Sequence, residues 1–143
     1  MTEQCAPDLL RQVEAEQQRL RGILSGLDQP TLTQRPPRGG WSVIENVRHL
    51  LFAEQLHLGR FAPGVVHWSP LGFTPGGMQL QRKLLLDEPE PVTDIEAVLA
   101  AWDAVHAGLR DYLQDDSPQL IKQLSRNLRH LRAHINAIER LLR

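Results

Sequence analysis

Two histidines toward the C-terminal end of the chain have a spacing that suits metal binding. His130 and His134 lie in the segment RHLRAHINAI. On a helix both rings would project from one face, one turn apart. They would lie roughly 60–100° to one side of Leu131, at the flank of an apolar seam. Two stacked imidazoles there could offer two nitrogens to one cation, with a third ligand from another helix and an open position for water.

A purely structural interpretation of the same pair is also open. Histidines on an amphipathic helix can line the edge of a buried seam or face solvent, and a lone histidine such as His49 is more often packed or exposed than a ligand. The sequence uses histidine freely, with His57, His67 and His106 in addition. The residues alone therefore leave metal binding and ordinary helix packing as alternatives.

The composition is that of an ordinary globular domain. The 143 residues are 41% hydrophobic and 23% charged, which predicts a single domain over residues 1–143. The formal net charge of −1 gives no electrostatic basis for binding nucleic acid or a membrane surface. One cysteine, Cys5, fits a reducing compartment. With no signal-peptide pattern and no bilayer-length apolar run, we expect a cytoplasmic protein.

Helical periodicity dominates the sequence, and no segment alternates convincingly as a strand. Pro7 suits the first turn of a helix whose apolar stripe ends at about Leu27. After a Pro/Gly-rich loop, Ser42-Val43-Ile44-Glu45 fits a capping box. It predicts a second helix from about Val43 to Arg60, apolar on more than one face and therefore packed on several sides.

Two further helices follow a long irregular connection, residues 61–92. Thr93-Asp94-Ile95-Glu96 predicts another capping box at the start of a helix whose apolar stripe ends at Tyr112. The break DDSP caps the last helix, where leucines and isoleucines alternate spacings of three and four, as in a bundle seam. The predicted fold is all-α, a four-helix bundle with the long connection between the second and third helices.

The connection itself is long enough to be functional rather than idle. Within it, GMQLQRKLLL could form a short helix. His67 and Trp68 could contribute to a lid or a pocket wall, or be ordinary loop residues with the indole half buried.

The combination of WSVIENVRHL with HLRAHINAIERLL in the last helix resembles the DinB/YfiT-like superfamily. The resemblance implies a four-helix bundle that binds a divalent metal through one histidine of the second helix and an H-x-x-x-H pair of the last. Trp41, Ser42 and Glu45 match the W-S-x-x-E start of the second helix in that family. The implied metal ligands are His49, His130 and His134.

The sequence also departs from the family pattern. Many members carry a further histidine beside the second ligand of the last helix, where this chain has Ala133 and Ile135. The break before the last helix is shorter than in some relatives. Neither departure removes a ligand, but both bear on how the site is supported.

Two carboxylates lie close to His49 in the sequence. Glu45, four residues before it, could support the ligand from behind, although capping the helix is the preferred role. Glu54 lies further along the same helix. Neither is identified as a general base, and no catalytic residue is assigned.

Imidazole ligands favour zinc, and they also accept nickel, iron or manganese. Members of the superfamily include S-transferases and isomerases that use small thiols, and others are described as metal-dependent hydrolases. The resemblance thus implies a metal-dependent thiol S-transferase or hydrolase, acting on a small thiol or electrophile and forming a homodimer. The alternatives are a non-catalytic, stress-associated bundle that dimerises or binds a small molecule, and a structural bundle whose histidines face solvent.

Overall fold

The computed structural model describes residues 5–61, 69, 71–73, 79–80, 83–84, 92–113 and 117–143. Helices dominate these residues, as the sequence predicts. The four long helices are α1 (Ala6–Leu24), α3 (Val43–Leu58), α4 (Ile95–Arg110) and α5 (Pro118–Leu141). The smaller elements are α2 (Gln29–Thr33), the 3-10 turn Gly59–Phe61 and the antiparallel pair β1 (Gln79–Leu80) and β2 (Lys83–Leu84).

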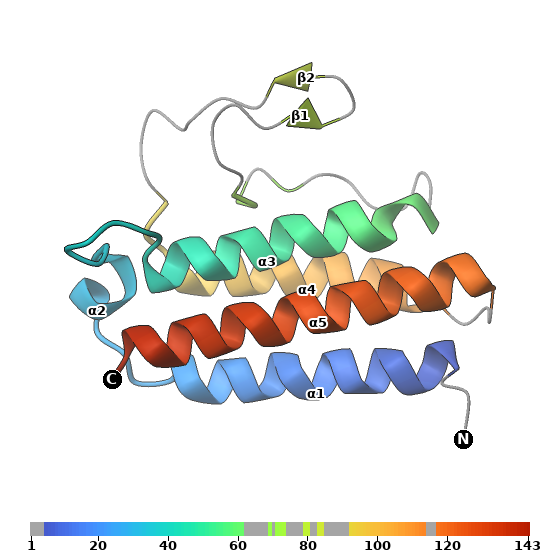
Figure 1. Ribbon diagram of the computed structural model, residues 1–143, viewed down its shortest axis with the longest axis horizontal. Coiled ribbons are helices and arrows are strands. Elements are labelled where there is room, and N and C mark those ends of the chain that lie inside the picture. Colours follow the sequence, from blue (N-terminus) through green and yellow to red (C-terminus); the bar gives the residue numbers. More distant parts are fainter. Residues whose placement is uncertain are drawn as a thin grey trace.

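The long helices form a bundle in which α5 packs against α1 and α3, and α3 also packs against α4 (Figure 1). Helices α3 and α4 run in the same direction, opposite to α1 and α5 (Figure 1). Since α3 and α4 begin at the same end of the bundle, the chain between them has to return along its length. This topology accounts for the long connection. None of the helices among the described residues is long and apolar enough to cross a membrane.

The predicted capping box begins α3. The Ser42 hydroxyl accepts from the Glu45 N–H at 3.2 Å, and the Glu45 carboxylate accepts from the Ser42 N–H at 3.0 Å. Arg35 donates to both oxygens of that carboxylate, at 2.9 and 2.6 Å. Glu45 therefore caps the helix and is already fully engaged, which confirms the preferred role.

Helix α3 is enclosed on nearly all sides, as its sequence predicts. Its buried residues include polar ones, with Arg48 2% and Glu54 0% exposed. The reason is its position, because α5, α4 and α2 all pack against it. Because so little of α3 is exposed, side chains on its different sides can lie in different buried surroundings.

The structure differs from the sequence predictions in several details. A short helix, α2, interrupts the Pro/Gly-rich loop because Asp28 caps it, accepting from the Thr31 N–H at 2.9 Å. Helix α3 ends at Leu58 and is followed by a 3-10 turn. Helix α4 is capped by Asp94 rather than Thr93, which leaves no reciprocal carboxylate one turn on.

The fourth difference lies in GMQLQRKLLL, where residues 79–80 and 83–84 form the β1–β2 pair instead of a helix. An isolated helix this short is only marginally stable in water. In the antiparallel pair, the backbone groups of β1 and β2 hydrogen-bond to each other instead. In addition, Tyr112 lies beyond the end of α4 and is 49% exposed, and Leu113 is buried in its place. His67 and Trp68 lie outside the described residues.

Candidate metal centre

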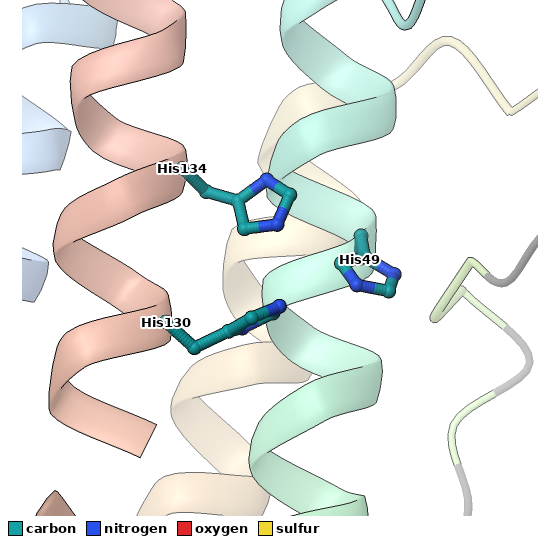
Figure 2. A group of neighbouring side chains, drawn as sticks. All are labelled: His49, His130 and His134. Atoms are coloured by element: carbon teal, nitrogen blue, oxygen red, sulfur yellow. The ribbon is translucent and has the colours of Figure 1, made fainter. Parts of the chain in front are cut away.

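Three histidines from two facing helices come together on one side of the bundle. His49 projects from α3, and His130 and His134 project from α5 toward the same space (Figure 2). One ligand atom can be chosen from each ring such that all three lie within 4.8 Å of one another. The residues predicted as ligands are therefore brought together.

The helix geometry explains why the pair on α5 faces its partner. Leu131 and Ile135, the residues that directly follow each histidine, are 2% and 0% exposed and fix that stripe of α5 in the core. The two histidines flank the stripe, half-buried, with ring centroids 4.5 Å apart. The centroid of His49 lies 5.1 Å from that of His130 and 5.0 Å from that of His134. A tetrahedral zinc site needs donor nitrogens about 3.4 Å apart, so small side-chain rotations would close the cluster.

Asn46 fixes the orientation of His134. The Asn46 amide nitrogen donates to the carbonyl of Ser42 at 2.9 Å, which turns the amide oxygen toward the histidine. That oxygen lies 2.8 Å from Nδ1 of His134. Since an amide oxygen can only accept, Nδ1 must carry the proton, and the lone pair of the ring lies on Nε2. Ser42, which caps α3, thus orients His134 on α5 through the side chain of Asn46.

For His49, the acceptor that fixes the tautomer of the ring is a backbone carbonyl. Nδ1 of His49 lies 3.3 Å from the Phe73 carbonyl oxygen, so this ring also holds its proton on Nδ1 and keeps its lone pair on Nε2. The Phe73 N–H donates to the Arg48 carbonyl at 3.1 Å, and Arg48 Nε donates to the Leu71 carbonyl at 2.8 Å. These hydrogen bonds hold residues 71–73 against α3 beside His49, and residues 71–73 take part in them through backbone groups.

His130 differs from the other two histidines. Its Nδ1 is buried and has no hydrogen-bond partner among the described residues. Beside it, on the α3 side, lies His57, with ring centroids 5.7 Å apart, and His57 is itself paired through Nδ1 with Asn127 Oδ1 at 3.2 Å. A buried polar atom without a partner is costly, and such atoms often mark the place of an absent ion or water.

All three rings are held in the neutral form. Burial lowers the pKa of His49, and burial with the nearby His134 and His49 lowers the pKa of His130 to about 3. Burial and His49 lower the pKa of His134 to about 4. Neutral imidazoles keep the lone pairs that a metal needs. The donor set therefore fits a divalent cation.

Aromatic side chains form the walls of the cluster. The indole of Trp41 lies 4.8 Å from the ring of His49 and stacks on His134 at 6.0 Å, measured between centroids. Phe52 stacks on His49 at 5.9 Å. Each of the three histidines remains partly exposed, so a further ligand can reach the cluster from solvent.

Neither of the carboxylates considered from the sequence lies in the cluster. Glu45 is engaged in the cap with Arg35. Glu54 points to the opposite side of α3, where Trp102 Nε1 donates to it at 3.0 Å and His106 lies 3.4 Å away. Among the described residues, the cation-binding group consists of histidines alone.

Sequence reasoning missed Asn46 and the Phe73 carbonyl. The signal for Asn46 was present, since an amide one turn after the cap and three residues before His49 shares a face with that ligand. The carbonyl has no comparable signal, because every residue carries one.

Bundle and site together define a class, the helical bundles that carry a histidine cluster between two facing helices. A sequence model of the DinB superfamily matches residues 12–142, and the chain belongs to that superfamily. Comparison with curated proteins and with solved structures gives no significant match.

Proposed function

We propose that this protein is a metal-dependent enzyme in which His49, His130 and His134 hold one divalent cation, with zinc as the expected metal. The observation that carries the proposal is the convergence of three neutral imidazoles within 4.8 Å. Two of them have their tautomers set by oxygen acceptors, so that Nε2 is available. Membership of the DinB superfamily supports the same assignment.

The open side of the cluster suits a thiol or a water molecule. A cation bound there supplies Lewis acidity, which lowers the pKa of either group toward neutrality. The surrounding residues bind and orient: Trp41 and Phe52 provide apolar walls that exclude water from the rings they cover. Among the described residues, no carboxylate joins the cluster. The proton released by the thiol or water would pass to the buffer. We propose a thiol S-transferase, with hydrolysis as the alternative reaction.

The first test is elemental analysis of untagged protein purified without chelators. We expect about one divalent ion per chain in the wild type and none in His49→Ala. His106→Gln is the matched control, because His106 lies on the far side of α3 and contacts Glu54 and Glu14 instead. Wild-type protein that neither contains nor takes up a metal would overturn the proposal.

The second test is turnover by the metal-loaded protein. With a cysteine-derived thiol and chlorodinitrobenzene, a carbon–sulfur bond forms while chloride leaves and the thiol proton enters the buffer. Nitrophenyl acetate tests hydrolysis in parallel. We expect metal-dependent turnover in at least one assay and its loss in His49→Ala. A fully loaded protein that is inactive in both would favour the non-catalytic bundle.

A further inference from the structure

A short part of the long connection, the strap, lies along α3 and consists of Ser69 and residues 71–73. Hydrogen bonds attach it to the helix at two places. The Ser69 N–H donates to the side-chain oxygen of Gln55 at 2.7 Å, and the Phe73 N–H donates to the Arg48 carbonyl at 3.1 Å. The two attachment points on α3 are about two turns apart, so the strap follows the helix rather than crossing it.

The strap contacts two polar side chains of α3 that are buried. Arg48 is 2% exposed and Gln55 is 1% exposed. Arg48 Nε donates to the Leu71 carbonyl at 2.8 Å, and its Cζ lies 5.3 Å from the centre of the Phe73 ring. Gln55 Nε2 has no hydrogen-bond partner among the described residues. When the strap lifts, water replaces these hydrogen bonds, so docking carries only a modest net free energy.

Gly72 allows the strap to approach α3 closely. A Cβ atom at this position would lie 3.4 Å from the Phe52 backbone and 3.4 Å from the amide nitrogen of Gln55. Gly72 does not have a positive φ, so the lack of space, and not the backbone conformation, favours glycine there. A larger side chain at this position would therefore push the strap away from the helix.

The strap reaches the histidine cluster at Phe73. The Phe73 carbonyl oxygen lies 3.3 Å from Nδ1 of His49, and the Phe73 ring packs edge-on against Trp41 at 5.3 Å. The Trp41 indole in turn lies 4.8 Å from the His49 ring. If the strap lifts, His49 loses the acceptor that keeps its lone pair on Nε2, and the aromatic wall beside it loses one member.

We infer that docking of the strap and metal binding at His49 are coupled. The docked strap raises the affinity of the histidine cluster for a divalent cation, and a bound cation keeps the strap docked. By linkage the two effects have the same size. The inference rests on the proposed function, since it takes His49 as a ligand. It adds a device that regulates the centre, and it makes Gly72 and Gln55 positioning residues that act through Phe73.

Gly72→Val tests the effect of the strap on the metal. The valine should lift the strap and move the Phe73 carbonyl away from His49. We expect zinc affinity to fall about tenfold, measured by competition with a chromophoric chelator. Gly59→Val is the matched control, because no atom lies within 4 Å of a Cβ placed at Gly59. It should keep the wild-type affinity.

Nitrogen-15 spectra of the metal-free proteins report the cause of the loss. The His49 ring should carry its proton on Nδ1 in the wild type and in Gly59→Val, and should show both tautomers in Gly72→Val. A change that merely disturbs packing would not alter this signature.

Gln55→Leu loosens the strap from the side of the helix. It removes the acceptor for Ser69 together with a buried amide nitrogen that has no described partner. The free energy of unfolding should therefore not fall, while zinc affinity does. Loss of affinity without loss of stability separates positioning from a structural role.

Hydrogen exchange at the Phe73 amide tests the effect of the metal on the strap. This N–H donates to the Arg48 carbonyl when the strap is docked. Saturating zinc should slow its exchange in the wild type by about tenfold, the same factor by which affinity falls in Gly72→Val.

Several outcomes would overturn the coupling while the metal proposal stands. They are wild-type affinity or a single His49 tautomer in Gly72→Val, wild-type affinity in Gln55→Leu, an equal loss of affinity in Gly59→Val, and exchange at Phe73 that zinc leaves unchanged. Wild-type protein that binds no zinc would overturn the proposed function, and the coupling with it.

Discussion

Helix α3 separates a cluster of three histidines from a second cluster, in which His106 meets Glu54 and Glu14, and the two have opposite electrostatic character. On one side, His49 meets His130 and His134, and burial lowers the pKa of all three. On the other side, His106 packs against Glu54. Burial by itself would lower the pKa of His106 too, but hydrogen bonds and charge from Glu54 and then Glu14 raise it to about 9.

The second cluster is a closed network. Both oxygens of Glu54 are occupied: Gln17 Nε2 donates to one at 3.1 Å and Trp102 Nε1 to the other at 3.0 Å. His106 lies 3.4 Å from Glu54 through Nδ1 and 3.0 Å from Glu14 through Nε2. Arg110 also approaches Glu14, at 3.5 Å. Helices α1, α3 and α4 are linked by this network.

The difference between the clusters lies in their acceptors. His106 faces two carboxylates, so it is charged and its nitrogens are used within the protein. The three histidines face an amide oxygen, a carbonyl oxygen and, for His130 Nδ1, no described partner. Neutral acceptors fix a ring without raising its pKa strongly, and they leave a lone pair for a metal. The same residue type thus stabilises the bundle at one site and is available for binding at the other.

The largest effect should come from removing the charge of the closed network. Glu54→Gln keeps the size of the side chain but leaves the Trp102 N–H or His106 poorly paired in the core. We expect the free energy of unfolding to fall by roughly 3 kcal/mol, measured by urea denaturation. Glu139→Gln, at the exposed pair with Arg19, should cost less than about 1 kcal/mol. Similar losses for the two variants would show that the network adds nothing beyond a surface pair.

The charge on His106 should make stability depend on pH. Its folded-state pKa of about 9 lies above the ordinary 6.5, so the folded protein holds this proton more tightly than the unfolded chain. The stabilisation is fully present below pH 6.5 and is lost as the pH rises through 9, by roughly 3 kcal/mol. Metal-free protein should show this decline, and His106→Gln should not. The metal-site histidines have lowered pKa values and titrate below this window.

Asn46→Ala tests whether a neutral acceptor is enough to orient a ligand. Without the amide oxygen, His134 loses the partner that fixes its tautomer. We expect metal affinity to fall about 10–100-fold, measured by competition with a chromophoric chelator. Asn136→Ala, at an exposed position on α5, is the control. An affinity within about twofold of the wild type would mean that the ring is oriented by packing alone.

The smallest effect should be on the stability of metal-free His130→Gln. The Nδ1 atom of His130 has no described partner to lose, so we expect the free energy of unfolding to change by less than about 1 kcal/mol. Urea denaturation in the presence of a chelator measures it. A loss comparable to that of Glu54→Gln would mean that the histidine cluster, too, is part of what holds the bundle together.

Sequence reasoning predicted the long helices, and it selected three histidines that the fold brings together. The helices follow from local signals, whereas His49 entered the set through the resemblance to the superfamily. The spacing of His130 and His134 and the capping box at Ser42 can be read directly. The network around Glu54 could not be predicted, since it joins residues of three helices that share no pattern in the sequence. The short helix α2 and the β1–β2 pair were missed because tertiary context decides short segments.

The proposed ligands lie on two helices, α3 and α5, which are far apart in the sequence and meet only in the folded chain. An ion bridging α3 and α5 would therefore bind the folded chain and not the unfolded one. By mass action, a free metal concentration a hundredfold above the dissociation constant would add about 2.7 kcal/mol to the free energy of unfolding. Metal supply would then govern how long each molecule survives unfolding and degradation, as well as whether its site is loaded.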